Sequence, residues 1–485
     1  MSSPPAARAR HVVVVGGGIA GVAAAHRLRV LRPGLRVTLL EGAPELGGKL
    51  ALAEVGGILT DVGAEAILAR RPEGVTLARE VGLADDVVHP ETTTARLWTR
   101  GEMRPMPRSL MGVPADVSSL SGVVSRAGLT RAALDAVIPP PRLADDQDVS
   151  VGALVGERLG KEVVDRLVEP MLGGVYAGHS RELSARAAVP GLVVHLDGEH
   201  SLTAAAAAAM LVSSSERSER VEMAPPPGPG QPAAPVFAGI AGGVGRLPGA
   251  VATTSGAVVE TGAIVRSLTR TADGWALEVG PTRSPRQVSC DAVVLATPAR
   301  PTARLLEHVA PAAARELDGV EYASMAVVSL AFSGRDLPET TGSGFLVPPV
   351  DGHSVKGATY SFAKWGWVSD AGRDDDLSLL RCSIGRHREE HVLQVSDEEL
   401  VALAVRDLAD AVGLSVLPVD SHVQRWGGGL PQYAVGHVAR VQRVRAGLTS
   451  VSGVAVCGAA YDGVGIPACI ASAHLGVDKV LADLG

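Results

Sequence analysis

The strongest constraint on the fold is a glycine-rich turn near the N-terminus, between an apolar strand and an Ala-rich helix. The sequence at positions 11–28 reads HVVVVGGGIAGVAAAHRL. The run His11–Val15 is short and β-branched, as buried parallel strands are. Gly16, Gly18 and Gly21 then form a G-x-G-x-x-G pattern, whose glycines permit a tight turn, close approach of a pyrophosphate and close packing of helix on strand. The predicted helix Ile19–Leu28 would direct its first N–H groups at the phosphates.

The residues that follow support a dinucleotide site. A second apolar strand is predicted at Val37–Leu40, and Glu41 ends it, twenty residues after Gly21. A carboxylate at this position can accept a hydrogen bond from a ribose hydroxyl. The alternative for Glu41 is a solvated acid at the end of a strand.

A second glycine pair favours FAD over NAD. Glu41 is followed by five residues and then by Gly47, Gly48 and Lys49. A nicotinamide-binding unit has no need of this pair, although a plain Gly-Gly turn remains an alternative. Here the chain resembles the flavoprotein superfamily of amine oxidases, phytoene desaturases and protoporphyrinogen oxidases, whose glycine pair packs close to the cofactor.

Composition excludes several classes of function. The net charge of −7 argues against a nucleic-acid or anionic-membrane partner. The four cysteines are far apart and lack a C-x-x-C motif, which argues against a metal site and fits a reducing cytoplasm. The N-terminus is polar, and no run of about 18 apolar residues exists. We therefore expect a cytoplasmic protein without stable membrane insertion.

The remaining pattern predicts an α/β fold whose nucleotide domain is discontinuous. A buried parallel strand is expected at Asp291–Pro298, and a strand–Gly–helix unit at the C-terminus, with its helix at Ala468–Ala482. Helices are expected at 129–137, 151–159, 162–172 and 397–412, the second and fourth begun by Ser150 and Ser396. A hairpin is predicted from Ala257–Val265 and Trp275–Val279, and an antiparallel sheet from strands at 325–332, 344–347, 358–363 and 379–384. Residues 97–114 are expected to be extended and irregular, and 214–235, rich in Pro, Ser and Gly, to form a mobile loop.

Three separated motifs narrow the resemblance. The first reads EPMLGGVYAG at 169–178, the second Trp426-x-x-x-Leu-Pro-Gln-Tyr-x-Val-Gly-His at 426–437, and the third GAAYDGVGIPACI at 458–470. Together they are similar to the porphyrinogen oxidases of haem synthesis, above all to the soluble, oxygen-dependent coproporphyrinogen III oxidases that carry FAD. The likeness covers nearly the whole chain.

The resemblance implies three regions and a set of cofactor contacts. The FAD-binding domain would comprise residues 1–88, 239–300 and 445–485, the antiparallel-sheet substrate domain 89–114, 189–238 and 301–444, and the helical domain 115–188. The residues implied to line FAD are Gly16, Gly17, Gly18, Ile19, Ala20, Gly21, Glu41, Gly48, Lys49, Gly63, Ala64, Glu65, Val265, Trp426, Val464, Gly465 and Ile466. Trp426 could instead be a core aromatic residue. Cys457 and Cys469 are interpreted as packing residues, so FAD is expected to be non-covalent.

The chemistry that the resemblance implies needs no catalytic triad, and the sequence contains none. FAD takes hydride from a bridging methylene carbon of the porphyrinogen, and three such two-electron steps, with O₂ as acceptor, give the porphyrin and three H₂O₂. No catalytic side chain and no metal are expected. The propionates of the substrate call for cations. The candidates for contact with the propionates are Arg71 and Lys364. Either could instead be a solvated surface charge, which is the interpretation that we favour for Lys364. Tyr176 is a third candidate and either lines the substrate pocket or fills the helical core.

Other functions stay open at this stage. The substrate is expected to be coproporphyrinogen III in haem b synthesis, with protoporphyrinogen IX as the alternative. An amine oxidase or carotenoid desaturase could use the same scaffold. A flavoprotein that serves as a haem-pathway scaffold is the non-enzymatic alternative, and transient contact with the next enzyme of the pathway is a further expectation.

Overall fold

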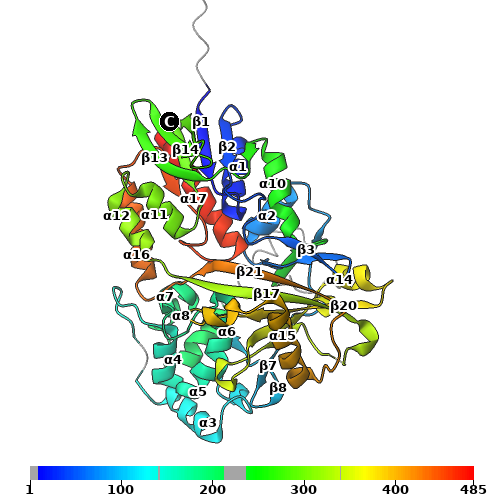
Figure 1. Cartoon of the computed structure of the whole chain (residues 1–485). Coiled ribbons are helices and arrows are strands. Elements are labelled where there is room, and N and C mark those ends of the chain that lie inside the picture. The colour runs from blue at the N-terminus through cyan, green and yellow to red at the C-terminus, as the bar shows by residue number, and fades with distance from the viewer. Residues whose placement is uncertain (1–8, 140–141, 212–235, 339) are drawn as a thin grey trace, which may run out of the picture.

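A five-stranded parallel sheet forms one half of the molecule in this computed structural model, which describes residues 9–139, 142–211, 236–338 and 340–485. The predicted loop 214–235 and the first eight residues lie outside the described residues. The sheet has the order β12-β2-β1-β16-β22, and all its pairs are parallel. Its strands are β1 (His11–Val15), β2 (Arg36–Leu40), β12 (Val258–Glu260), β16 (Ala292–Leu295) and β22 (Val454–Val456). Strands from the start, middle and end of the chain therefore close one sheet (Figure 1).

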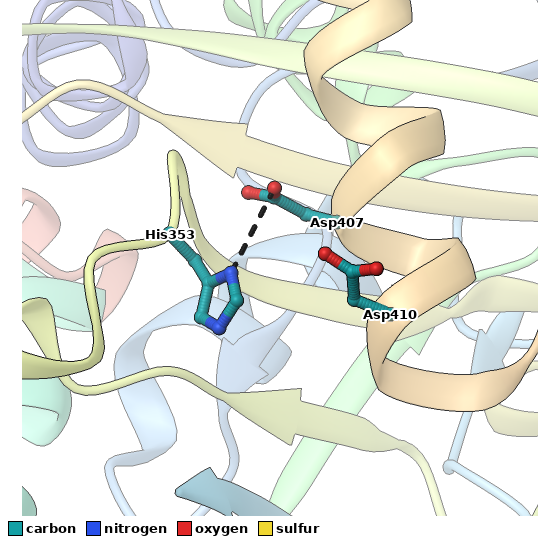
Figure 2. A group of neighbouring side chains, drawn as sticks. All are labelled: His353, Asp407 and Asp410. Carbon is teal, nitrogen blue, oxygen red and sulfur yellow. Dashed lines mark ion pairs between the residues drawn. The ribbon is translucent and has the colours of Figure 1, made fainter. Parts of the chain in front are cut away.

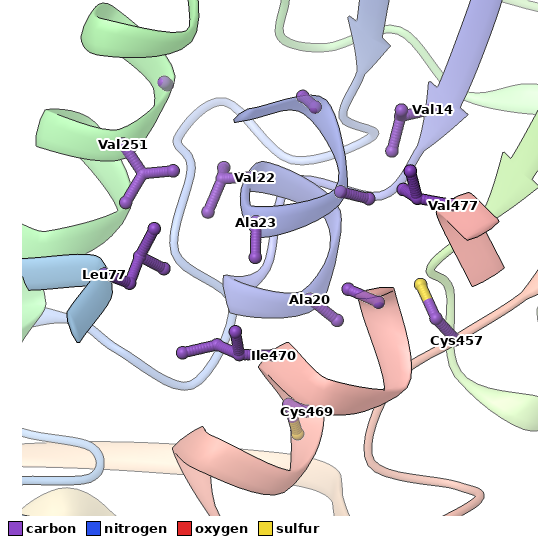
Figure 3. Packing of buried hydrophobic residues seen from close by; sticks show 14 of the residues in the cluster. Val14, Ala20, Val22, Ala23, Leu77, Val251, Cys457, Cys469, Ile470 and Val477 are labelled. Atoms are coloured by element: carbon purple, nitrogen blue, oxygen red, sulfur yellow. The ribbon is translucent and has the colours of Figure 1, made fainter. Parts of the chain in front are cut away.

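Alternation along β1 divides the core into two layers. Val12 and Val14 contribute to the layer that packs under the helices, whereas Val13 and Val15 face the opposite layer. Figure 3 shows the helical layer, in which Ala23 of one helix lies among larger apolar side chains. Four helices contact one another in this layer: α1 (Ile19–Leu31), α2 (Pro72–Glu80), α10 (Leu247–Ser255) and α17 (Ile466–Leu484).

A three-stranded antiparallel sheet contributes to the second layer and corrects one prediction. It consists of β13 (Val265–Thr271), β14 (Gly274–Val279) and β15 (Arg286–Cys290). The prediction of one strand over Ala257–Val265 was wrong, because β12 joins the parallel sheet and the hairpin partner of β14 begins only at Val265. Gly262, at φ +64°, separates the two strands in a conformation that an extended chain does not adopt.

The other half of the molecule contains a seven-stranded sheet of order β21-β17-β20-β19-β18-β7-β8. Its pairs are antiparallel except β18 with β7. The strands are β21 (Asp420–Pro431), β17 (Tyr322–Ser333), β20 (Leu377–Ile384), β19 (Val355–Tyr360), β18 (Gly344–Leu346), β7 (Ala95–Thr99) and β8 (Glu102–Pro105). Residues 97–114 are thus more ordered than predicted. Pro105 is tolerated because β8 is an edge strand.

Helices lie beside this sheet (Figure 1). The Ser150 hydroxyl caps α4 (Val151–Leu159) by accepting from the N–H of Ala153 at 3.1 Å, and Ser396 forms a capping box with Glu399 at the start of α15 (Asp397–Val412). Both helix starts are confirmed. The predicted helix 162–172 is interrupted by a π turn at Val164–Val168, between α5 (Lys161–Val163) and α6 (Glu169–Tyr176).

Shorter elements complete the described fold. The strands are β3 (Leu52–Val55), β4 (Ile58–Asp61), β5 (Ile67–Leu68), β6 (Val87–Val88), β9 (Ser109–Leu110), β10 (Val113–Pro114) and β11 (Phe237–Ile240). The helices are α3 (Arg126–Ala133), α7 (Ala185–Ala188), α8 (Pro190–His195), α11 (Ala299–Leu306), α12 (Pro311–Asp318), α13 (Ser361–Lys364), α14 (Gly366–Gly372) and α16 (His437–Leu448).

Strand β19 buries a lysine. Lys356 is 3% exposed, and burial, together with the positive charge of nearby Arg386, lowers its pKa from 10.5 to about 7. Arg386 is itself buried and pairs with Glu389 at 3.5 Å. Two cations therefore share a poorly solvated region beside one carboxylate, which is an unfavourable place for an ammonium group.

We predict that Lys356→Met raises the melting temperature at pH 7. The folded-state pKa lies below the unfolded value, so between pH 7 and 10.5 the unfolded chain binds more protons, and wild-type stability rises with pH. The gain from the substitution should be largest at or below pH 7, on the order of a few kcal/mol, and should shrink towards pH 10. Thermal unfolding at pH 7 and 9.5 measures it, with exposed Lys161→Met as the control. A loss of stability at pH 7 would contradict the prediction.

Candidate functional site

A cavity of about 850 Å³ lies between the parallel sheet, the seven-stranded sheet and α6, and its size suits an organic cofactor or substrate. Among the residues predicted to bind FAD, those that line it are Gly16, Gly18, Ile19, Ala20, Glu41, Gly48, Lys49, Gly63, Ala64, Glu65, Val265, Trp426, Val464, Gly465 and Ile466. Gly17 and Gly21 do not line the cavity, and their role is in the glycine-rich turn between β1 and α1. The cavity thus gathers segments from distant parts of the chain.

The glycine turn leaves room where a ligand would approach. A Cβ on Gly18 would meet no atom within 4 Å, whereas one on Gly21 would collide with the carbonyl oxygen of Gly16. Gly16 itself has φ +107°. No side chain caps the start of α1, and no acidic residue occupies its first turn. An uncapped helix N-terminus beside an open glycine is suited to a pyrophosphate.

Glu41 closes the turn from the end of β2. One carboxylate oxygen accepts from the N–H of Gly17 at 2.5 Å, and the other accepts from the N–H of Ala43 at 2.7 Å. The side chain is therefore not simply solvated, and it also lines the cavity. Its remaining lone pairs suit ribose hydroxyl groups.

The second glycine pair docks onto the first turn. The N–H of Gly47 donates to the carbonyl of Gly17 at 2.9 Å, and the N–H of Ala64 donates to the carbonyl of Lys49 at 3.0 Å. A Cβ on Gly63 would collide with that same carbonyl of Lys49. Glycine at position 63 is thus required for these two cavity-lining segments to touch.

Tyr433 joins the second and third motifs. Its hydroxyl donates to the carbonyl of Ala459 at 2.6 Å and accepts from the N–H of Gly463 at 2.8 Å. It thereby ties down both ends of the loop before α17. The N-cap residue of this helix is Gly465, so no side chain caps the helix. Because Gly465 and Ile466 line the cavity, the N-terminus of α17 also faces it. The side chain of Gln432 donates to the carbonyl of Tyr176 at 2.8 Å, which connects the first motif as well.

Glu65 lies in a triad of charges. Its carboxylate pairs with Lys364 at 2.5 Å and with Arg381 at 2.9 Å. Burial alone would raise the pKa of Glu65, but the two cations outweigh it and lower the pKa to about 2. Arg381 lines the cavity, although it was not among the residues predicted from the sequence. The available signal was one arginine within the otherwise apolar or small-residue strand LSLLRCSI.

The three substrate-binding candidates are held by contacts with other side chains. Arg71 precedes α2, pairs with Glu73 at 2.7 Å and has a side chain that is 40% exposed. Tyr176 is buried against Tyr433, with ring centroids 5.5 Å apart. Lys364 is held by Glu65, so it is not the solvated surface charge that we favoured. None of the three is among the lining residues of the described structure.

The indole of Trp426 both lines the cavity and donates to the carbonyl of Val62 at 3.1 Å. Cys469 was interpreted as packing, and it does belong to the helical core layer (Figure 3), yet it also lines the cavity. All four cysteines are buried and free.

A group with metal-ligand chemistry lies elsewhere, at His353, Asp407 and Asp410 (Figure 2). One oxygen of Asp407 accepts from the backbone N–H groups of Ser354 and Val355, at 2.7 and 2.9 Å. The ring of His353 stacks on Trp98 at 3.9 Å. These contacts give the buried Asp407 and His353 structural roles in holding the turn before β19.

We predict different outcomes for two glycine substitutions. Gly18→Val places its side chain in open space, so the apoprotein should keep its melting temperature within about 2 °C while FAD binding is lost. Gly21→Val should destabilise the apoprotein, because its side chain collides with the backbone of Gly16. Thermal unfolding of both apoproteins and flavin titration distinguish the two. Retention of FAD by Gly18→Val would contradict the proposed place of the pyrophosphate.

No helix in the described part of the chain is long and apolar enough to cross a membrane. The chain is 37% identical, over 98% of its length and 98% of the relative, to coproporphyrinogen III oxidase of Mycobacterium tuberculosis H37Rv. It is 29% identical to coproporphyrinogen III oxidase of Bacillus subtilis, over 98% of both chains.

A crystal structure of an Exiguobacterium protein assigned as a protoporphyrinogen oxidase superposes with a TM-score of 0.81, at 28% identity, over 98% of this chain and 99% of the other. Residues 19–481 match the flavin containing amine oxidoreductases. The predicted fold class and FAD cofactor are thereby confirmed. The chain belongs to the family of flavin-containing amine oxidoreductases.

Proposed function

We propose that this oxidoreductase converts coproporphyrinogen III to coproporphyrin III in haem b synthesis, with O₂ as acceptor and three H₂O₂ formed. The observation that carries the proposal is the identity of 37% along 98% of the chain to a relative named for this substrate. Protoporphyrinogen IX is the alternative substrate, since a solved neighbour bears that assignment. We also propose that the protein is located in the cytoplasm. A transient contact with the next enzyme of the pathway is part of the same proposal.

The residues present fit FAD. Gly18 offers an open approach, Glu41 presents a carboxylate at the end of β2, and α1 and α17 both direct uncapped N-termini towards the cavity. Bound there, FAD would supply the redox chemistry, as acceptor of hydride from a methylene bridge of the substrate, with O₂ as the final electron acceptor. We propose that the seventeen residues predicted from the sequence hold it, Gly17 and Gly21 through the turn rather than by direct contact.

The chain contributes position and electrostatics. The wall that the seven-stranded sheet contributes is largely apolar, with Val327, Phe345 and Leu346 lining the cavity, and it suits the apolar ring system of a tetrapyrrole. The carboxylates among the described lining residues are Glu41 and Glu65, and both already accept hydrogen bonds. Neither is poised as a general base. We infer that pyrrole protons leave without a dedicated side chain.

The proposal includes the division of the chain into three regions. The sheets support a discontinuous FAD domain built on β1 and β22, and a substrate domain built on the seven-stranded sheet. The helical region at 115–188 packs its own apolar core around α4 and α6. Arg71 and Tyr176 stay candidates for contact with the substrate. For Tyr176 the support is that its neighbours Gly174 and Val175 line the cavity.

We predict that FAD is bound without a covalent bond. Cys382 and Cys469 are the cysteines among the described lining residues, but burial raises the pKa of each thiol to about 12, so both are poor nucleophiles. Acid precipitation of the yellow protein should release all flavin into the supernatant, where its absorbance is measured. Flavin that stays with the pellet, and is released by Cys469→Ala or Cys382→Ala, would show a covalent link.

We predict turnover of porphyrinogens and no turnover of amines. The holoenzyme should consume O₂ and develop porphyrin fluorescence with coproporphyrinogen III, with a lower kcat/KM for protoporphyrinogen IX, which has fewer propionates to pair with cations. Peroxide should form at three per porphyrin. Putrescine and cyclohexylamine test the amine-oxidase alternative. Binding of coproporphyrinogen without O₂ consumption would favour the scaffold alternative.

A further inference from the structure

Arg381 is the cation on the wall that the seven-stranded sheet presents to the cavity. Among the described lining residues the basic side chains are Lys49 and Arg381. Lys49 belongs to the glycine-pair segment, and burial lowers the pKa of its ammonium group, an effect that nearby Cys469 and Glu41 oppose. Arg381 instead lies in β20, paired in register with Thr359 of β19, and is surrounded by apolar and small lining residues.

The guanidinium of Arg381 is fixed but not saturated. One Nη donates to Glu65 at 2.9 Å, and the other donates to the carbonyl of Gly63 at 2.5 Å. A guanidinium has five N–H donors, and these two bonds use one N–H of each Nη, so each Nη keeps a second N–H. Because Arg381 lines the cavity, these remaining N–H groups can donate to an acceptor inside it.

The charges specify an anionic acceptor. Glu65 carries one negative charge, and Lys364 and Arg381 carry one positive charge each, so these three side chains have a surplus of one positive charge. Asp61 is also close enough for Arg381 to lower its pKa, but burial outweighs this and raises the pKa to about 6, and its carboxylate accepts from the N–H groups of Val244 and Gly245. Lys364 does not line the cavity, so Arg381 is the cation of this group that a ligand in the cavity can contact. The side chain is 11% exposed, where water screens the attraction weakly.

We propose that Arg381 binds one propionate carboxylate of the porphyrinogen and so helps to select an acidic tetrapyrrole. This inference rests on the proposed function. Glu65 and the Gly63 carbonyl hold the planar guanidinium before substrate arrives, so little side-chain entropy is lost when a carboxylate docks. Arg381 would bind the substrate directly, while Glu65 is its positioning residue.

The test uses the full-length holoenzyme and two matched porphyrins. Coproporphyrin III carries free carboxylates, and its tetramethyl ester does not. Arg381→Gln should weaken binding of coproporphyrin III, followed by Soret absorbance, by about ten- to a hundredfold and leave binding of the ester unchanged. KM for coproporphyrinogen III should rise by a similar factor while FAD content and the flavin spectrum stay the same. Arg381→Lys, which keeps charge but loses the fork, should recover part of the affinity.

The control is Arg425→Gln. Arg425 is on β21 of the same sheet, and its guanidinium donates to the carbonyls of Leu393 and Val395, away from the cavity lining. It should leave both affinities unchanged.

Equal affinity of wild type and Arg381→Gln for coproporphyrin III would overturn the inference. So would an altered flavin spectrum with unchanged KM, since the guanidinium would then serve FAD. If Arg381→Gln does not fold, unchanged affinity in Arg381→Lys overturns it equally. A wild-type enzyme that neither binds coproporphyrin III nor oxidises its porphyrinogen would instead refute the proposed function, and the inference with it.

Discussion

The site depends on one close contact, between the backbone of Gly21 in the first turn of α1 and the carbonyl of Gly16 at the end of β1. The contact leaves no space for a Cβ, so only glycine allows the helix to begin there. From that point the helix N-terminus faces the cavity, Glu41 reaches the N–H of Gly17, and the Gly47 segment docks against the same turn. A side chain at position 21 would displace all three.

The sequence predicted the cofactor half of the site better than the substrate half. A glycine pattern between a strand and a helix has few structural solutions, so the turn could be placed from its spacing, and the family resemblance supplied the lining residues farther along the chain. Cations are different, because a lysine or arginine can lie in solvent, in an ion pair or at a ligand. Lys364 was favoured as a surface charge, yet it is paired with Glu65, and Arg381, not singled out, lies on the cavity itself. Which partner a charge finds is a tertiary property that no local pattern encodes.

The same limit explains the errors in the fold. Strand β12 and strand β13 follow each other closely and both look like halves of a hairpin, but Gly262 turns the chain so that each joins a different sheet. Strand β8 was hidden by Met103 and Pro105, because an edge strand tolerates residues that a central strand does not. Local signals gave the correct starts of α4 and α15, where a serine cap completes its bonds within a few residues.

The order of strands in the parallel sheet has a consequence for how the chain is made. Strand β1 pairs with β16 almost three hundred residues later, and β16 pairs with β22, which begins at Val454. Contacts between residues so far apart in the sequence form slowly, because the entropy cost of closing a long loop comes before the stabilising contacts are made. Because β22 and α17 follow all the other strands of this sheet in the sequence, they leave the ribosome after those strands. Until then β16 presents an unpaired edge. The loop that Tyr433 ties to α17 is also absent until that moment. Completion of the cavity thus waits for the residues from Val454 onward, and until they emerge the nascent chain is exposed to misassembly.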